Sequence, residues 1–112
     1  MGYNIVMKIP RRFQPILWSK DVNTIDPVRD QTYIVHQILR YGNLTQIKWL
    51  LKRYSLPEVR KTFLDKPKRI YNPAGFNFLK SFILKINKNI PAKDYVQIPG
   101  RLLIISQPEK KS

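Results

Sequence analysis

The sequence predicts a mainly α-helical single domain of about four helices, with short β segments at the N- and C-termini. Four stretches of apolar residues recur at the three- and four-residue steps of a helix, and capping residues precede each stretch. The chain has 112 residues, of which 43% are hydrophobic and 12% aromatic, so it can bury a core. We expect residues 1–106 to form this domain and the polar residues 107–112 to be a disordered tail.

The first helix is expected from about Pro27 to Tyr41. Asp26 supplies a side-chain acceptor at the N-cap, and the proline after it has the φ angle that a first helical residue needs. Asp30 follows in the first turn, where a negative charge interacts favourably with the helix dipole. Gly42, directly after Tyr41, is typical of a helix C-terminus.

Two more helices are expected to follow with almost no connection. Asn43 and Gln46 resemble a capping box, and the apolar spacing after them predicts a helix to about Tyr54. Ser55 and Glu58 form the S-x-x-E pattern of a capping box at the start of a third, short helix. This helix is expected to end before the next Lys-Pro pair.

A fourth helix is expected to begin at Asn72-Pro73, which repeats the cap-plus-proline start, and to stop near Asn87–Asn89. After it, Tyr95–Ile98 and Arg101–Ile105 flank Pro99-Gly100, a pair that suits the centre of a type II turn. A terminal β hairpin is therefore predicted.

The N-terminal segment has a different pattern. Apolar and polar residues alternate over Met1–Pro10, which predicts a short strand with one buried face. Two prolines favour an extended chain over Pro10–Pro15. We expect Trp18 to anchor this segment to the core, because burying its large ring contributes much apolar area.

Residues that could carry catalysis are scarce. The chain has no cysteine and one histidine, and its four glycines do not cluster into a phosphate-binding loop. His36 stands inside the first helix beside its apolar stripe, so a structural role is favoured over ligand binding or proton transfer. Asp21, Asp26 and Asp30 form the only local group of acids, and a turn, a cap and a helix dipole explain them better than a metal. We expect no enzymatic activity, no cofactor and no metal.

The compartment is inferred from what the sequence lacks. Without cysteine there can be no disulfide framework, which fits a reducing cytosol. The N-terminus lacks the pattern of a secretory signal, and no stretch approaches the roughly 18 apolar residues of a membrane span. The expectation is a cytoplasmic protein that does not contact a membrane.

The excess of positive charge is the clearest functional signal. The formal net charge is +14 and the isoelectric point is about 10.3, which suggests a polyanion or an acidic protein as partner. Much of this charge lies in a basic run over the second and third helices and the connection behind them. The candidate binding residues in this run are Lys48, Trp49, Lys52, Arg53, Arg60, Lys61, Lys68 and Arg69.

The basic run could simply be a solvated surface. Two functional interpretations also stay open: contact with nucleic acid and contact with a protein partner. The second and third helices are weakly similar to a helix-turn-helix whose second helix is Pro57–Leu64, and there only Arg60, Lys61 and Thr62 could reach base edges. Phosphate contact is therefore favoured over base reading. Several aromatic residues lie beside the apolar stripes and could be buried or available to a partner: Tyr41, Trp49, Tyr71 and Phe78.

Five motifs together resemble a known family: Trp18-Ser19, Ile25-Asp26, Tyr33–Gly42, Ile47–Tyr54 and Val59-Arg60. That family consists of small, uncharacterised prokaryotic helical proteins, and the match covers about residues 18–82. Its members are often found beside nucleotidyltransferase-type toxins of the abortive-infection class and are thought of as antitoxin-like. The resemblance implies a helical core and a toxin-like protein partner, and it brings no catalytic residue.

The expected function is therefore binding without catalysis. The favoured hypothesis is an antitoxin-like protein of a prokaryotic toxin–antitoxin or defence pair, which holds an acidic or nucleotide-handling protein and could also bind DNA. The alternative is a basic nucleic-acid-binding module without a toxin partner, in which the helical lysines and arginines contact phosphates.

Overall fold

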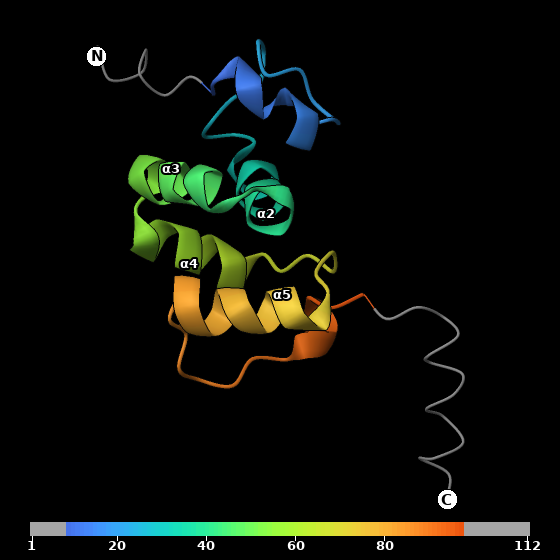
Figure 1. Ribbon diagram of the computed structural model, residues 1–112, viewed down its shortest axis with the longest axis vertical. Helices are drawn as coiled ribbons and strands as arrows, with labels where there is room; N and C mark the ends of the chain where they lie inside the picture. The colour runs from blue at the N-terminus through green and yellow to red at the C-terminus, as the bar shows by residue number, and fades with distance from the viewer. Residues whose placement is uncertain (1–8, 98–112) are drawn as a thin grey trace, which may run out of the picture.

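Three helices form the centre of the computed structural model, which describes residues 9–97. They are α2 (Gln31–Tyr41), α3 (Leu44–Tyr54) and α4 (Leu56–Asp65), and each packs against the other two. Figure 1 shows α2 nearly end-on, while α3 and α4 run across the view. The mainly helical fold predicted from the sequence is confirmed.

The starts of α3 and α4 follow the predicted capping residues. The Asn43 side chain accepts a hydrogen bond from the Gln46 N–H at 2.8 Å, and the Gln46 side chain accepts one from the Asn43 N–H at 2.9 Å. The Ser55 hydroxyl accepts from the Glu58 N–H at 3.4 Å. Ser55 has a φ of 72° and is the single residue between the two helices, so the chain reverses there within one residue.

The first helix begins later than predicted. Residues 27–30 form a separate turn, in which the Asp26 carboxylate accepts from the N–H groups of Val28 and Arg29 at 2.8 and 3.0 Å. The Asp30 carboxylate in turn accepts from the Asp26 N–H at 2.9 Å. These hydrogen bonds stabilise a turn in place of helix. Asp30 has a non-helical ψ of 19°, so the regular helix starts only at Gln31.

The N-terminal segment is not extended as predicted. It contains η1 (Arg11–Ile16), a 3-10 helix that packs against α2. Phe13 and Leu17 are fully buried, and the Phe13 ring lies 4.7 Å from the ring of Trp49. Trp18 is 58% exposed and contacts Tyr41, so the prediction that Trp18 anchors this segment in the core was wrong.

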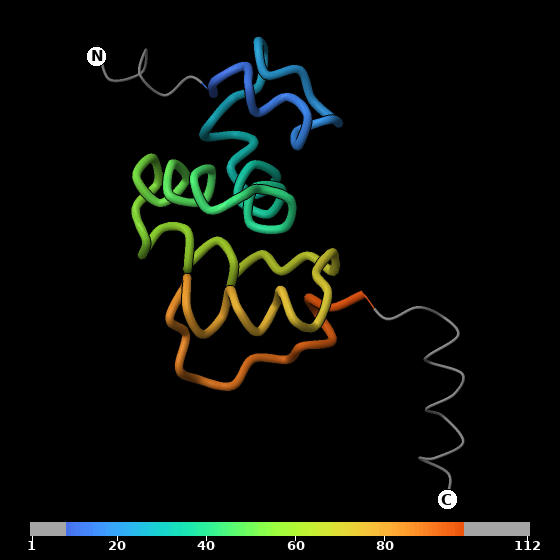
Figure 2. Tube along the Cα trace, in the orientation of Figure 1, coloured from blue at the N-terminus to red at the C-terminus, as the bar shows by residue number. Residues whose placement is uncertain are grey.

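The last helix is short and ends earlier than predicted. α5 (Pro73–Phe78) begins at the Asn72 cap and continues into a wider π-helical turn, η2 (Leu79–Ile83). Lys85 then has a φ of 53°, and the next N–H donates back to the Lys80 carbonyl at 2.8 Å, which ends the helix before residues 87–89. Figure 2 shows residues 84–97 running back along α5 toward its start, and η3 (Ala92–Asp94) forms part of this return.

The predicted terminal strands fall largely outside the described residues, as does the predicted tail at 107–112. Within residues 9–97, the β structure consists of one parallel bridge between Tyr71 and Val96. The Tyr71 N–H donates to the Tyr95 carbonyl at 2.8 Å, and the Gln97 N–H donates to the Tyr71 carbonyl at 2.8 Å. The described end of the chain is therefore paired with the connection between α4 and α5.

An aromatic cluster occupies the core between α2, α4 and α5. The rings of Phe63 and Tyr95 stack with centroids 4.4 Å apart, and Phe63 also meets Tyr71 edge-on at 5.6 Å. Phe76 of α5 lies 5.2 Å from Tyr95. Such ring pairs each contribute about 0.5–1.5 kcal/mol beyond the area they bury, so the cluster holds α5 and the returning chain onto α4.

His36 is buried beside this cluster and has a structural role, as the sequence predicted. Its Nε2 lies 2.6 Å from the Lys66 carbonyl and its Nδ1 lies 2.6 Å from the Tyr71 hydroxyl. A carbonyl can only accept, so Nε2 carries the proton and Nδ1 accepts from Tyr71. Burial, aided by the positive charge of Lys68, lowers the pKa of His36 to about 4 and keeps the ring neutral.

Other helix side chains hold irregular segments in the same way, by donating to main-chain carbonyls that regular structure leaves unpaired. Each such bond joins residues far apart in the sequence and measures 2.6 to 2.9 Å. The donor and acceptor pairs are Gln37 and Ile16, Arg40 and Ile70, Tyr54 and Pro27, and Arg60 and Leu84.

The Tyr71→Phe variant tests the contribution of the His36 contact to stability. The change leaves the ring in place but removes the donor to the buried Nδ1, so we expect the free energy of unfolding to fall by about 1–3 kcal/mol. Urea unfolding at pH 7 measures this loss. The matched control is Tyr41→Phe, which removes a hydroxyl from a surface ring and should change stability by less than about 0.5 kcal/mol. Equal stabilities for the two variants would contradict the assignment.

Candidate functional site

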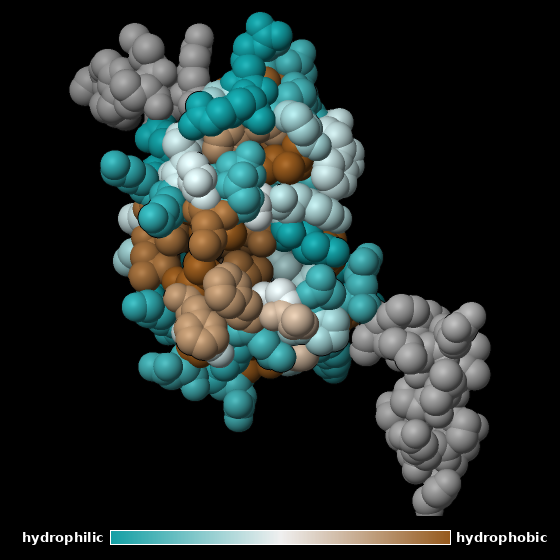
Figure 3. All heavy atoms as spheres, in the orientation of Figure 1, coloured by the Kyte–Doolittle hydropathy of each residue, from teal (hydrophilic) through white to brown (hydrophobic). Residues whose placement is uncertain are grey.

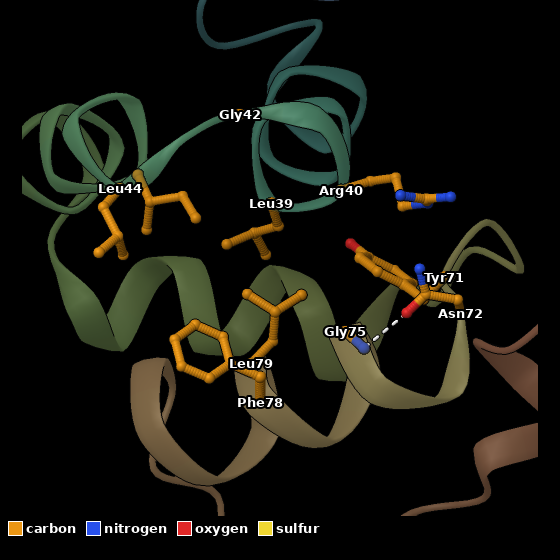
Figure 4. Close-up of a pocket in the computed structure, with 10 residues that line it drawn as sticks. Leu39, Arg40, Gly42, Leu44, Tyr71, Asn72, Gly75, Phe78 and Leu79 are labelled. Carbon is orange, nitrogen blue, oxygen red and sulfur yellow. Dashed lines mark hydrogen bonds between the residues drawn. The ribbon is translucent and has the colours of Figure 1, made fainter.

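A groove with a volume of about 180 Å³ lies between the α2–α3 junction and α5. Figure 4 shows Leu39 and Leu44 on one side of it and Phe78 and Leu79 on the other. The polar end of the groove is formed by Arg40, Tyr71 and Asn72. The remaining lining residues are Gly42, Ile47 and Gly75.

At both glycines of the groove lining, atoms of the adjoining helix end leave no room for a side chain. A Cβ on Gly42 would lie 2.6 Å from the Ile38 carbonyl oxygen, so this position can only be glycine without a shift of the backbone. A Cβ on Gly75 would lie 2.8 Å from the Asn72 Oδ1, which accepts a 2.6 Å hydrogen bond from the Gly75 N–H at the start of α5. The groove is therefore built by the ends of helices.

Large apolar side chains are left exposed in and beside the groove: Leu44 and Phe78 line it, and Phe82 lies next to Phe78. Leu44 is 58% exposed, Phe78 44% and Phe82 69%. The two phenylalanine rings lie 5.7 Å apart, so they form a continuous ridge along α5 and η2. Figure 3 shows an apolar area on this face of the molecule, where α3, α4 and α5 lie in Figure 1, with hydrophilic residues around it. We call Leu44, Phe78 and Phe82 the apolar ridge.

The structure leaves some residues of the predicted basic run exposed and partly buries others. Lys48 and Lys52 are exposed on α3, and Lys68 and Arg69 are exposed in the connection after α4. Trp49 is half-buried against Phe13, so packing is its main contact. Arg53, also in the predicted run, is partly buried on α3.

The residues of α4 that a helix-turn-helix would use all make contacts within the chain. The Arg60 Nε donates to the Leu84 carbonyl at 2.9 Å, and the Lys61 ammonium pairs with Asp65 at 2.6 Å. The Thr62 hydroxyl oxygen lies 3.0 Å from the Gln31 amide nitrogen, which donates to it. The Thr62 and Arg60 contacts join α4 to α2 and to the residue that follows η2, while the Lys61 pair is exposed within α4.

Of the four aromatic residues that the sequence left open, two are exposed. Tyr71 is buried and Trp49 is half-buried, whereas Tyr41 and Phe78 lie at the surface. Leu44 and Phe82 were not predicted as exposed, because both fit the apolar stripe of their helices.

The acidic residues that precede α2 are engaged locally. The Asp21 carboxylate accepts from the Asn23 N–H at 2.9 Å, which is the turn role that the sequence predicted. The Arg29 guanidinium, 2.9 Å from the Asp30 carboxylate, lowers the pKa of Asp30 to about 2. Among residues 9–97, no group of three or more histidine and acidic side chains is placed to hold a metal ion.

The comparisons with known proteins match part of the chain to one family. A family of unknown function (DUF6922) is similar to this chain over residues 13–63, the stretch that contains η1, α2, α3 and most of α4. No curated protein and no solved structure matches the chain. Of the helices described between residues 9 and 97, none is long and apolar enough to cross a membrane.

Proposed function

We propose that this protein is a non-enzymatic, antitoxin-like binding protein that holds a protein partner in the groove between the α2–α3 junction and α5. The observation that carries this proposal is the apolar ridge: Leu44 and Phe78 line the groove, Phe82 lies next to Phe78, and all three are exposed. Contiguous exposed apolar surface with a polar rim is typical of protein interaction sites. Burying each of these side chains on binding would contribute at most about 1.5–3 kcal/mol, since each is already partly buried.

The charges around the groove indicate what kind of segment it accepts. Arg40 lines its polar end, and Lys48 follows Leu44 by one helical turn and is exposed. The chain as a whole carries a formal net charge of +14. An apolar segment with acidic residues beside it is the complementary partner, because its charges would meet Arg40 and Lys48 at the rim.

The identity of the partner is proposed from the family resemblance of the five sequence motifs. Proteins with this pattern are often found beside nucleotidyltransferase-type toxins, so the partner would be such a toxin in the cytoplasm. The binding protein needs no catalytic group for this role, since occupying a surface of the toxin can be enough to inhibit it.

Co-expression with the product of the adjacent gene tests this proposal. We expect that product to arrest growth when expressed alone, and growth to recover when this chain is expressed with it. Leu44→Asp and Phe82→Asp should each abolish the recovery and the co-purification of one stoichiometric partner after nuclease treatment, because an unpaired carboxylate in an apolar contact is costly.

The matched control is Val28→Asp, which adds the same charge at a side chain that is 75% exposed and away from the groove. It should leave growth and co-purification unchanged. The proposal is wrong if the ridge variants, shown to be folded by their circular dichroism, rescue growth as well as the parent chain does.

A basic nucleic-acid-binding module is the second candidate function. It is favoured by Lys48 and Lys52, which are exposed and one turn apart on α3. Two ammonium groups at this spacing suit successive phosphates of one strand. Arg60 and Lys61 support it less, since both make contacts within the chain.

The salt dependence of duplex DNA binding tests this second candidate. Changing both Lys48 and Lys52 to Ala should reduce the slope of log affinity against log salt by about 0.9 for each phosphate that the protein no longer neutralises. Changing Lys88 and Lys93 to Ala removes the same charge from exposed positions outside the run. Identical slopes for the two double variants would exclude α3 as the phosphate-binding face.

A further inference from the structure

A second surface combines exposed aromatic rings with positive charge along α2. Trp18 is 58% exposed and Tyr41 is 40% exposed, and their rings meet edge-on with centroids 4.7 Å apart. The Arg40 guanidinium lies 4.8 Å from the centre of the Tyr41 ring. About two turns toward the helix start, the Tyr33 ring has the ammonium groups of Lys20 and Lys68 at 5.9 and 6.0 Å from its centre. We call these six residues the α2 aromatic cluster.

Helical spacing aligns the α2 members of the cluster. Arg40 and Tyr41 follow Tyr33 by about two turns, so the three share one side of α2, and the buried Gln37 lies between them. The distance along the helix from Tyr33 to Tyr41 is about 12 Å at the usual rise per residue. Trp18 and Lys68 come from segments far away in the sequence, which explains why the sequence did not predict the cluster.

Hydrogen bonds hold the rings in place before any ligand binds. The Gln37 amide donates to the Ile16 carbonyl at 2.7 Å, which fixes the segment just before Trp18. The Ser19 N–H donates to the Tyr33 hydroxyl at 2.9 Å. The Arg40 Nε donates to the Ile70 carbonyl at 2.6 Å, which ties the loop that contains Lys68 to the same side of α2. Binding would therefore cost little further loss of side-chain and loop entropy.

We infer that the α2 aromatic cluster binds single-stranded nucleic acid, with unpaired bases stacked on Trp18 and Tyr41 and the phosphates held by Arg40 and Lys68. Exposed aromatic rings beside a basic surface are the usual means of binding single strands. A duplex covers the faces of its bases, so these rings can stack only on bases that are unpaired. The charge in the cluster is positive, since the nearby Asp30 is held by Arg29 and Lys20.

This inference does not rest on the groove or its protein partner, although Arg40 belongs to both surfaces. It also differs from phosphate contact by α3, because it assigns affinity to ring stacking and to other residues. Failure of the apolar ridge experiments would leave it intact, and its own failure would leave the groove proposal intact.

Binding of fluorescein-labelled oligothymidylate, followed by anisotropy, tests the inference. Trp18→Ala should weaken binding by about five-fold or more, the loss expected for one base stack, while Trp18→Phe should retain most of the affinity. Intrinsic fluorescence gives a second readout that depends on stacking. The oligonucleotide should quench the tryptophan emission of the parent chain and leave that of Trp18→Phe, which keeps only Trp49, unchanged.

Two charge-matched variants separate the cluster from general attraction by a basic protein. Lys68→Ala and Lys93→Ala each remove one exposed ammonium group, and only the first belongs to the cluster. We expect Lys68→Ala to weaken binding more than Lys93→Ala, and a duplex of the same length to bind more weakly than the single strand.

Three results would overturn the inference. The first is Trp18→Ala binding the oligonucleotide as tightly as the parent chain. The second is equal losses of affinity for Lys68→Ala and Lys93→Ala. The third is Trp18→Ala losing the protein partner while its oligonucleotide affinity is unchanged, which would assign the cluster to a protein interface.

Discussion

The buried hydrogen bonds of His36 are the interaction on which the arrangement of the other parts depends. The imidazole stands on α2, donates to the Lys66 carbonyl and accepts from the Tyr71 hydroxyl, and thereby fixes both ends of the connection between α4 and α5. Tyr71 in turn fixes the end of the described chain, since its backbone forms hydrogen bonds with residues 95 and 97. A single side chain on α2 thus positions the start of α5 and the end of the described chain.

Both candidate surfaces include residues of this connection. Tyr71 and Asn72 form one end of the groove, and Asn72 caps α5, which carries part of the apolar ridge. Lys68, a few residues earlier, reaches the Tyr33 ring in the α2 aromatic cluster. Arg40 contributes to both surfaces, because it lines the groove and also lies over Tyr41. The same constraint therefore orients a site for a protein segment and a site for a nucleic acid strand.

Local signals predicted the parts of the fold that depend on neighbouring residues. The capping residues Asn43 and Ser55 indicated the starts of α3 and α4, and the position of His36 beside an apolar stripe indicated its structural role. The errors arose where a bond or backbone angle has no local signature. The Asp26 and Asp30 carboxylates close a turn that delays α2, and Lys85 adopts a left-handed conformation without being glycine.

The candidate site was likewise predicted only in part from the sequence. Basic residues were recognisable from the sequence as a group, but the contact of Arg60 with Leu84 is long-range and gives that residue a packing role. Trp18 was expected in the core because tryptophan is large and apolar. Instead, the neighbouring Leu17, directly after η1, is fully buried, and Trp18 lies at the surface. Which of two adjacent apolar residues is buried depends on the packing of the folded chain.

The state of the His36 ring decides whether this residue organises the fold, and ¹⁵N NMR of the imidazole between pH 7 and pH 4 measures it. We predict a neutral ring with the proton on Nε2 and a pKa of about 4, because burial disfavours the charged form. The pKa in the unfolded chain is about 6.5, so below that pH the unfolded state binds more protons. Stability should then fall by about 3 kcal/mol as the pH drops from 6.5 to 4. A ring that titrates near pH 6.5, or carries its proton on Nδ1, would contradict this role for His36.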